Sequence, residues 1–260
     1  MGEFQQLLLS LLGAIICLVF LVKCIRFLKY FIPYIWNILP PSFFRSMGEW
    51  AVITGAGDGI GRAYSFELAK RGLNVVLISR TLGKLQKIAF EIEQSTGQKV
   101  KIIQADFTKN DIYDALEESL QGLEIGILGP HQLQHHFPHQ DDTDNFETDG
   151  PKAFTRTFSK ALQAEYKAKG IIIKTVTPYS VSTPMTLNSE PNIINKTAED
   201  FAEESLEYIA LGEETFGCLA HEIWARFVHC IPLWVFQSER VQDLFQTLIS
   251  EHLKKNLKST

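Results

Sequence analysis

The chain is poor in cysteine and in basic residues, and both deficits exclude classes of function. Its four cysteines lie far apart without the spacing of metal ligands, so we expect free thiols rather than a disulfide framework. The 25 basic residues are outnumbered by 30 acidic ones, and the resulting net charge of −5 argues against a nucleic-acid partner. No Gly-Lys-Ser/Thr sequence is present, which excludes the phosphate loop of nucleoside triphosphatases.

A long hydrophobic run is present at the N-terminus. Residues 7–22 are apolar except for Ser10 and Gly13, and the apolar pattern resumes after Lys23. Because Lys23 can extend its ammonium group to the membrane surface, the run approaches the roughly 20 residues of a spanning helix. A cleaved signal peptide is the alternative, but no basic segment precedes the run and no small-x-small site follows it. We therefore expect a membrane anchor.

The charges beside this run predict its orientation. Lys23, Arg26 and Lys29 follow the run and Glu3 precedes it, so the positive-inside rule places the downstream domain on the cytosolic side. Residues 1–46 are predicted to form the anchor and an interfacial connector. The aromatic residues and prolines typical of such a connector are Tyr30, Phe31, Pro33, Tyr34, Trp36, Pro40 and Pro41.

A glycine-rich turn follows the first apolar run of the domain. The run 51–53 leads into Thr54-Gly55-Ala56-Gly57-Asp58-Gly59-Ile60-Gly61, and a helical pattern comes next. This helix is expected to stop at Gly72, where a left-handed cap is cheapest for glycine. Glycines let the backbone pass close to phosphates, and a helix start offers N–H groups and a positive dipole end. A tight turn between strand and helix is the alternative. We predict a dinucleotide site formed by Thr54, Gly55, Gly57, Gly59, Ile60 and Gly61.

The end of the second apolar run indicates which dinucleotide binds. Residues 75–78 are continuously apolar, as is typical of a parallel strand buried on both faces, and Ser79 and Arg80 follow them. An Asp or Glu at this point would accept hydrogen bonds from the ribose 2′-hydroxyl of NAD. The Arg80 guanidinium can instead pair with a 2′-phosphate, which predicts NADP(H). A solvated surface arginine is the alternative.

Helices and strands alternate through residues 47–128. Amphipathic patterns at 82–96 and 112–120 separate apolar strands at 100–106 and 123–128. This order predicts a Rossmann-type, doubly wound parallel sheet of the α/β class. Residues 47–128 would then be its NADP-binding half.

The glycine spacing, with Thr54 in front, resembles that of the short-chain dehydrogenase/reductase family. The resemblance implies that Asp106 contacts the adenine ring, with a helix cap as the alternative. It also implies that Thr183, beyond a strand predicted at 171–176, hydrogen-bonds the nicotinamide side of the cofactor. Tyr179 stands where the family has a glycine, a departure that the steroid branch shares.

The family pattern breaks after Leu128. In the family, this strand runs into Asn-Asn-x-Gly, a long helix, a strand that ends in the catalytic Ser, and a Tyr-x-x-x-Lys pair. Residues 129–151 instead hold few large apolar side chains and cannot supply the buried face of a core helix and a central strand. Histidines and aspartates are frequent there, but no His-x-x-x-His helix or fixed cage is apparent, and we assign no metal site. The sheet is therefore expected to be interrupted after its fourth strand.

One member of the family's catalytic set is matched. Lys152-Ala153-Phe154 resembles the end of Tyr-Ser-Ala-Ser-Lys-Ala-Phe, so Lys152 matches the active-site lysine. An ordinary exposed lysine at a helix start is the alternative. Four residues earlier, Thr148 stands in place of the tyrosine, and its hydroxyl pKa is too high for proton transfer at neutral pH.

The genetic code offers an explanation for the break. Codons for residues 134–149, read one nucleotide later, can encode an amphipathic helix that resembles the central helix of the family. We interpret residues 129–151 as an aberrant segment produced by exon skipping or by a mispredicted gene. Residues 152–260 are predicted to be the C-terminal part of the reductase domain. Their apolar helices could cover a lipophilic substrate, pack in the core or contact the membrane. Within them, Asn195-Lys196-Thr197 is an unlikely glycosylation site on the cytosolic side, and Thr197 is expected to cap a helix.

The steroid branch of the family supplies the expected function. The resemblance implies that the intact enzyme would sit in the endoplasmic reticulum membrane and use NADPH to reduce the 17-ketone of androstenedione to testosterone. We expect this chain to be an inactive form of such an enzyme, with a steroid and the membrane as partners; a homodimer is compatible with the resemblance. Two alternatives stay open: a catalytically dead product that at most binds nucleotide, and an enzyme similar to very-long-chain 3-ketoacyl reductases.

Overall fold

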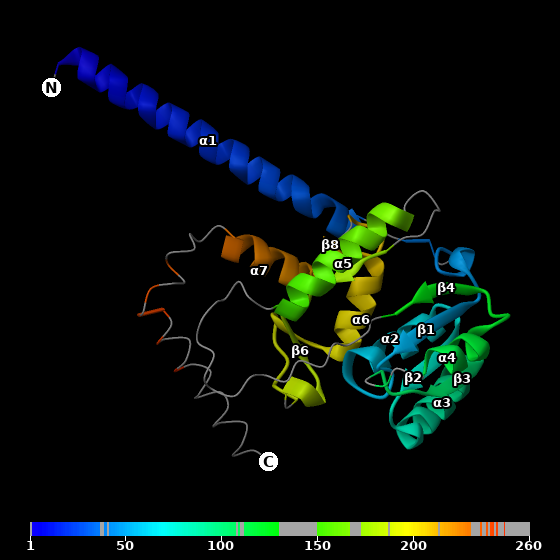
Figure 1. Cartoon of the computed structure of the whole chain (residues 1–260). Helices are drawn as coiled ribbons and strands as arrows, with labels where there is room; N and C mark the ends of the chain where they lie inside the picture. Colours follow the sequence, from blue (N-terminus) through cyan, green and yellow to red (C-terminus); the bar gives the residue numbers. More distant parts are fainter. Residues whose placement is uncertain are drawn as a thin grey trace. The chain divides into compact units, whose positions relative to one another are not determined.

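The chain forms two compact units in a computed structural model, Met1–Ile38 and Leu39–Thr260 (Figure 1). The structure describes residues 2–36, 39–40, 42–107, 109, 112–129, 150–166, 173–186, 188–212 and 214–229, and the single positions 235, 238, 240–241, 243 and 247.

The first unit is one helix, α1 (Glu3–Trp36). Its window of mean hydropathy 2.7 is long and apolar enough to cross a membrane. Side chains such as Leu8, Ile16 and Phe20 are exposed, which is costly in water and natural in lipid. The predicted interfacial connector from Tyr30 onward is helical as far as Trp36, because the helix continues through Pro33. Proline lacks only its own N–H donor, and the helix ends three residues later.

The second unit contains a four-stranded parallel sheet in the order β3-β2-β1-β4. The order confirms the predicted Rossmann-type sheet, since the chain winds first to one side of β1 and then to the other. Its strands are β1 (Trp50–Thr54), β2 (Asn74–Ser79), β3 (Val100–Gln104) and β4 (Ile125–Leu128). The connecting helices are α2 (Gly59–Lys70), α3 (Leu82–Thr96) and α4 (Tyr113–Leu120), and a short helix η1 (Arg45–Met47) precedes β1.

Both faces of the central strands are buried. Ala51 and Ile53 of β1 pack with α2 and α3, whereas Val52 between them packs on the other face with Leu116 of α4. This alternation explains why the strands read as unbroken apolar runs in the sequence. The helix before β2 ends where predicted, with Gly72 in the positive φ region at +90°.

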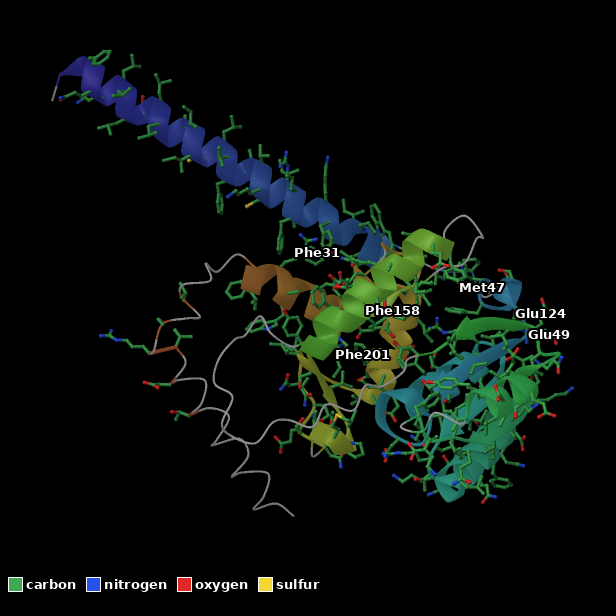
Figure 2. All side chains as sticks on the ribbon, viewed as in Figure 1. Phe31, Met47, Glu49, Glu124, Phe158 and Phe201 are labelled. Atoms are coloured by element: carbon green, nitrogen blue, oxygen red, sulfur yellow. The ribbon has the colours of Figure 1, made fainter. Side chains whose placement is uncertain are left out.

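Two glycines allow β4 to lie against the start of β1. A Cβ built on Gly126 would lie 2.6 Å from the Gly48 backbone nitrogen, so neither position has room for a side chain. The Glu124 carbonyl also accepts hydrogen bonds from the backbone N–H groups of Glu49 and Trp50, each at 3.0 Å. Figure 2 shows Glu49 and Glu124 together at this corner of the sheet.

The sheet stops at β4 among the residues that the structure describes, in agreement with the predicted interruption. Leu128, at the end of β4, is 75% exposed. The rest of the unit comprises α5 (Gly150–Tyr166), β5 (Thr175–Val176) paired with β8 (Glu214–Thr215), β6 (Ser180–Ser182) paired with β7 (Asn195–Thr197), a short helix η3 (Pro184–Thr186), α6 (Ala198–Glu207) and α7 (Leu219–His229). Strand β5 is shorter than the predicted strand 171–176, of which residues 171–172 lie outside the described residues.

Helix α6 joins the C-terminal part of the domain to α2. Phe201 and Leu206 of α6 belong to the same buried cluster as the first face of the sheet. The Tyr64 hydroxyl lies 2.5 Å from the Ser205 hydroxyl in the interior, and burial raises the Tyr64 pKa to about 12. On α7, by contrast, Ile223 and Phe227 are exposed.

We expect Tyr64→Phe to lower the free energy of unfolding by about 1 kcal/mol at pH 7, because it removes a buried hydrogen bond. The native pKa lies above the ordinary value of 10, so the Tyr64 contribution is present below pH 10 and is lost as pH rises toward 12. The variant should therefore lose less stability over this window. Thermal unfolding followed by circular dichroism at several pH values measures both effects, and equal alkaline losses would contradict the role of Tyr64.

Candidate nucleotide site

The glycine turn joins β1 to α2 through a backbone contact that excludes side chains. A Cβ on Gly61 would lie 2.3 Å from the Gly55 carbonyl oxygen. Gly55 and Gly59 have φ values of +66° and +52°, which L side chains rarely adopt. Gly57 faces the end of β2, since its Cβ would lie 2.8 Å from the Ser79 hydroxyl oxygen. The start of α2 is thereby seated directly on the turn.

Asp58, which sequence reasoning passed over, is the N-cap of α2. Its carboxylate accepts a hydrogen bond from the Gly59 N–H at 2.9 Å and pairs with the Lys84 ammonium group at 2.7 Å. The hydrogen bond with Lys84 is the main cause that lowers the Asp58 pKa. The N-cap preference for Asp directly before a helical pattern was the available signal for the cap.

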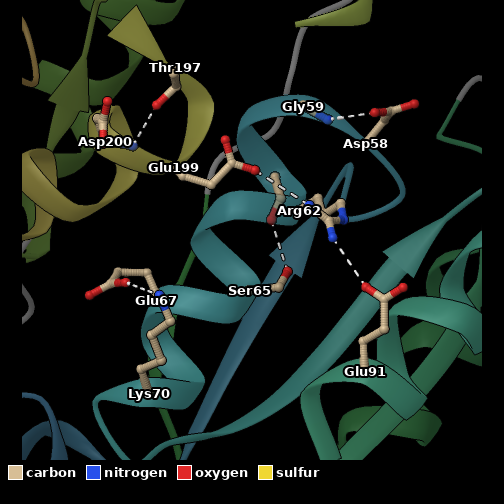
Figure 3. A network of polar contacts seen from close by, with 11 residues as sticks. Asp58, Gly59, Arg62, Ser65, Glu67, Lys70, Glu91, Thr197, Glu199 and Asp200 are labelled. Atoms are coloured by element: carbon tan, nitrogen blue, oxygen red, sulfur yellow. Dashed lines mark hydrogen bonds and ion pairs between the residues drawn. The ribbon is translucent and has the colours of Figure 1, made fainter. Parts of the chain in front are cut away.

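Arg62 ties α2 to two other helices (Figure 3). Its guanidinium pairs with Glu91 of α3 at 3.1 Å and with Glu199 of α6 at 3.4 Å. It also lies over the Phe66 ring, 4.7 Å from the ring centroid. The two ion pairs connect α2, which begins at the glycine turn, to α3 and to α6.

Three predicted cofactor residues lie at the carboxyl ends of adjacent strands. Ser79 closes β2, and its carbonyl accepts a hydrogen bond from the Ala105 N–H beyond β3. Arg80 is exposed, and its carbonyl accepts from the Gln104 side-chain amide at 2.8 Å. Asp106 is half-buried two residues beyond β3. The structure thus brings Ser79, Arg80 and Asp106 to one edge of the sheet, where dinucleotides bind in such folds.

Thr183 reaches the glycine turn from a distant part of the sequence. A Cβ on Gly59 would lie 3.2 Å from the Thr183 methyl carbon, so the two residues are neighbours. Thr183 is buried, and its N–H donates to the Thr186 hydroxyl at 2.9 Å. The Thr186 hydroxyl in turn donates to the Val181 carbonyl at 2.8 Å. This local network holds the Thr183 loop in shape beside the start of α2.

A buried polar network supports that loop from behind. The Asn195 side chain accepts from the Ser180 hydroxyl and donates to the Ser189 and Glu190 carbonyls. One ring nitrogen of His221 lies 2.6 Å from the Ile194 carbonyl oxygen. Because Asn195 is buried, the Asn195-Lys196-Thr197 sequence serves as structure rather than as a glycosylation site. Thr197 caps α6, as predicted, by accepting from the Asp200 N–H at 3.0 Å.

The catalytic half of the predicted site is represented only by the backbone of Lys152, which lies in α5. Its side chain and Thr148 lie outside the described residues. No group of three or more His, Cys, Asp or Glu residues that could hold a metal ion occurs in the part of the chain that the structure describes.

Comparison with known proteins identifies the family. The family model for short chain dehydrogenases matches residues 49–125. Human 17-beta-hydroxysteroid dehydrogenase type 3 is 48% identical over 308 aligned positions, which cover 99% of each chain. The chain belongs to the short-chain dehydrogenase/reductase family. Within this oxidoreductase family, it is similar to steroid dehydrogenases.

A second group of relatives in this family is more distant. The very-long-chain 3-oxoacyl-CoA reductase of Anas platyrhynchos is 35% identical, over 72% of this chain and 77% of the relative. Among solved structures, a 7beta-hydroxysteroid dehydrogenase superposes with a TM-score of 0.62 at 19% identity, covering 80% of this chain and 99% of the other. A short-chain dehydrogenase from Sphingobium yanoikuyae in complex with NADPH gives 0.56 at 20% identity, covering 77% and 95%. These two likenesses concern the fold.

The alignment with the human enzyme also bears on the break after β4. It spans 308 positions and nearly all of both proteins, whereas this chain has 260 residues. About 50 positions of the relative therefore have no counterpart inside this chain. An internal loss of this size fits a sheet that stops at its fourth strand.

We expect Gly61→Ala to lower the free energy of unfolding by about 2 kcal/mol, because the new methyl group would overlap the Gly55 carbonyl. Gly83→Ala, in the first turn of α3, is the matched control. No atom lies within 4 Å of its added Cβ, so we expect no loss and a gain of up to about 0.5 kcal/mol. Thermal unfolding of both variants tests this, and equal stability of the two would refute the close approach.

Proposed function

We propose that this chain is a membrane-anchored, NADP(H)-binding form of a 17-ketosteroid reductase that has lost catalytic turnover. The carrying observation is the sheet that, among the described residues, ends at β4 beside an intact glycine turn. The nucleotide-binding half of the domain is complete in its strands and helices. The half that would hold the reacting groups lacks about 50 positions relative to the human enzyme.

The residues present fit a dinucleotide. Gly57 leaves an opening beside Ser79 that a side chain would fill, and Gly59 leaves one beside Thr183. Ser79 and Arg80 provide a hydroxyl and a cation at the end of β2, with no acidic residue in the position that would favour NAD. NADPH supplies a hydride when bound. We assign Thr54, Gly55, Gly57, Gly59, Ile60 and Gly61 to the pyrophosphate, Ser79 and Arg80 to the 2′-phosphate, Asp106 to the adenine and Thr183 to the nicotinamide side.

The proposed substrate class and location follow from the relatives and from α1. The name of the human relative, a 17-beta-hydroxysteroid dehydrogenase, supports a steroid substrate. We propose the reduction of androstenedione to testosterone as the parent reaction. The apolar helix supports an anchor in the endoplasmic reticulum membrane. Lys23, Arg26 and Lys29 follow the run, which supports a cytosolic position for the domain.

The proposed loss of turnover has a chemical reason. Ketone reduction needs a proton donor at the developing alkoxide as well as a hydride. In this sequence Thr148 stands four residues before Lys152, where the family has tyrosine, and no family-type serine strand precedes it. A lysine alone cannot replace both groups.

We expect Arg80→Asp to weaken NADP(H) at least tenfold relative to NAD(H), because it replaces a cation that can pair with the 2′-phosphate by a repelling carboxylate. Binding titrations of the full chain in detergent, followed by nicotinamide fluorescence, give both affinities. Arg45→Asp, at an exposed cation before β1, is the charge-matched control and should preserve the preference. An unchanged NADP(H) preference in Arg80→Asp would remove this residue from the site.

We expect no NADPH oxidation by the purified full chain with androstenedione or with a 3-ketoacyl-CoA. Replacing residues 129–151 with the corresponding segment of the human enzyme should restore turnover of androstenedione, since it supplies the missing strand and proton donor. The same chimera with its inserted tyrosine changed to phenylalanine is the control and should stay inactive. Measurable turnover by the unmodified chain would refute the proposed loss of catalytic turnover. Preferential turnover of the 3-ketoacyl-CoA by the unmodified chain or the chimera would refute the steroid assignment.

A further inference from the structure

Lys84 lies at the point where the glycine turn meets the end of β2. A Cβ on Gly57 would lie 2.8 Å from the Ser79 hydroxyl oxygen and 4.0 Å from the Lys84 Cβ. The lysine belongs to the first turn of α3, directly after the segment that carries Arg80. Two polar side chains from one short stretch, Ser79 and Lys84, thus lie around one opening of the backbone, and Arg80 directly follows Ser79 in the sequence.

The ammonium group of Lys84 is held by an anion that belongs to the other side of this opening. Asp58 Oδ2 accepts from Lys84 Nζ at 2.7 Å, while Asp58 Oδ1 accepts from the Gly59 N–H. The carboxylate therefore has two tasks, to cap α2 and to neutralise Lys84. The hydrogen bond with the Gly59 N–H does not involve Lys84, so Asp58 can still cap α2 when the Lys84 ammonium group binds another anion.

The ion pair is exposed enough to exchange. The Lys84 and Asp58 side chains are 54% and 49% exposed, and ion pairs between side chains this exposed contribute little to stability. A phosphate offers a higher charge and more acceptor oxygens than a carboxylate. A phosphate group near Ser79 would thus compete effectively for the ammonium group.

We propose that Lys84 is a second cationic ligand, beside Arg80, for the 2′-phosphate of the nucleotide, and that Asp58 is the anion it leaves on binding. The position of Lys84 beside the end of β2 indicates which phosphate of the nucleotide it would bind. Residues at the end of β2 face the ribose 2′ position in this fold, whereas the pyrophosphate lies at the helix start. The inference rests on the proposed function, since it needs the glycine turn to bind a nucleotide.

Two substitutions should have opposite effects. Lys84→Met keeps the aliphatic stem and removes the charge, so it should weaken a ligand with a 2′-phosphate about tenfold. Asp58→Asn keeps an oxygen that can cap α2 but removes the competing charge, so it should tighten the same ligand about threefold. A purely structural role of the ion pair would make both variants bind more weakly.

The experiment is isothermal titration calorimetry of the full chain in detergent with adenosine 2′,5′-bisphosphate and with ADP. Both probes carry two phosphates, and only the first carries one at the 2′ position. Lys87→Met, one turn farther along α3 and also exposed, is the matched control and should change neither affinity by more than about twofold. Circular dichroism verifies that each variant keeps its helices.

Each result bears on the inference. Weakening by Lys84→Met confined to the bisphosphate, with tightening by Asp58→Asn, supports it. Equal weakening of ADP assigns Lys84 to the pyrophosphate and overturns the 2′ assignment, and so does an unchanged bisphosphate affinity in Lys84→Met. If the unmodified chain binds neither probe, the proposed nucleotide site fails together with this inference. If the unmodified chain binds and only the Lys84 effect is missing, the inference alone fails.

Discussion

The approach of α2 to the turn after β1 requires that position 61 carries no side chain, and the φ of +66° at position 55 favours glycine there. With a Cβ only 2.3 Å from a carbonyl oxygen, any other residue at Gly61 would push the helix away from the sheet. The direction of α2 follows from this contact. Arg62 and Tyr64 follow Gly61 by one and three residues. Arg62 forms an ion pair with Glu199 of α6, and the Tyr64 hydroxyl forms a hydrogen bond with the Ser205 hydroxyl of α6. A backbone contact of two glycines thus places the C-terminal part of the domain.

This arrangement explains how a domain with an interrupted sheet keeps its nucleotide site together. In the part of the chain that the structure describes, no further strand joins the four-stranded sheet after β4. Thr183 still lies beside Gly59, because α6 is fastened to α2 and because Thr186 and Asn195 shape the loop. The binding half and the loop that covers it are assembled around one helix. The reacting groups of the family belong to the part between them, so the proposed nucleotide binding and the proposed loss of turnover concern different parts of this chain.

The sequence predicted the parts of the fold that local physics determines. The apolar runs of β1 and β2, the positive φ of Gly72 and the Thr197 cap all follow from burial or from backbone geometry within a few residues. The Asp58–Lys84 pair was not predictable, since it joins residues 26 positions apart on separate helices. Strand β5 was overestimated because its length depends on neighbours, and its described partner is the two-residue β8. The roles of the cofactor residues stay predictions, although the structure gathers them at one edge.

The hydrogen bond between Tyr64 and Ser205 closes a long loop of the chain, and the entropic cost of closing that loop depends on its length. These residues are 141 positions apart, and the proposed loss at residues 129–151 lies between them. Closing a loop costs free energy that grows only with the logarithm of its length, so about 50 further residues would add only about 0.3 kcal/mol. The proposed deletion therefore changes the free energy of loop closure very little. The larger cost of the proposed deletion is the apolar surface that stays exposed to solvent, of which Leu128 is an example.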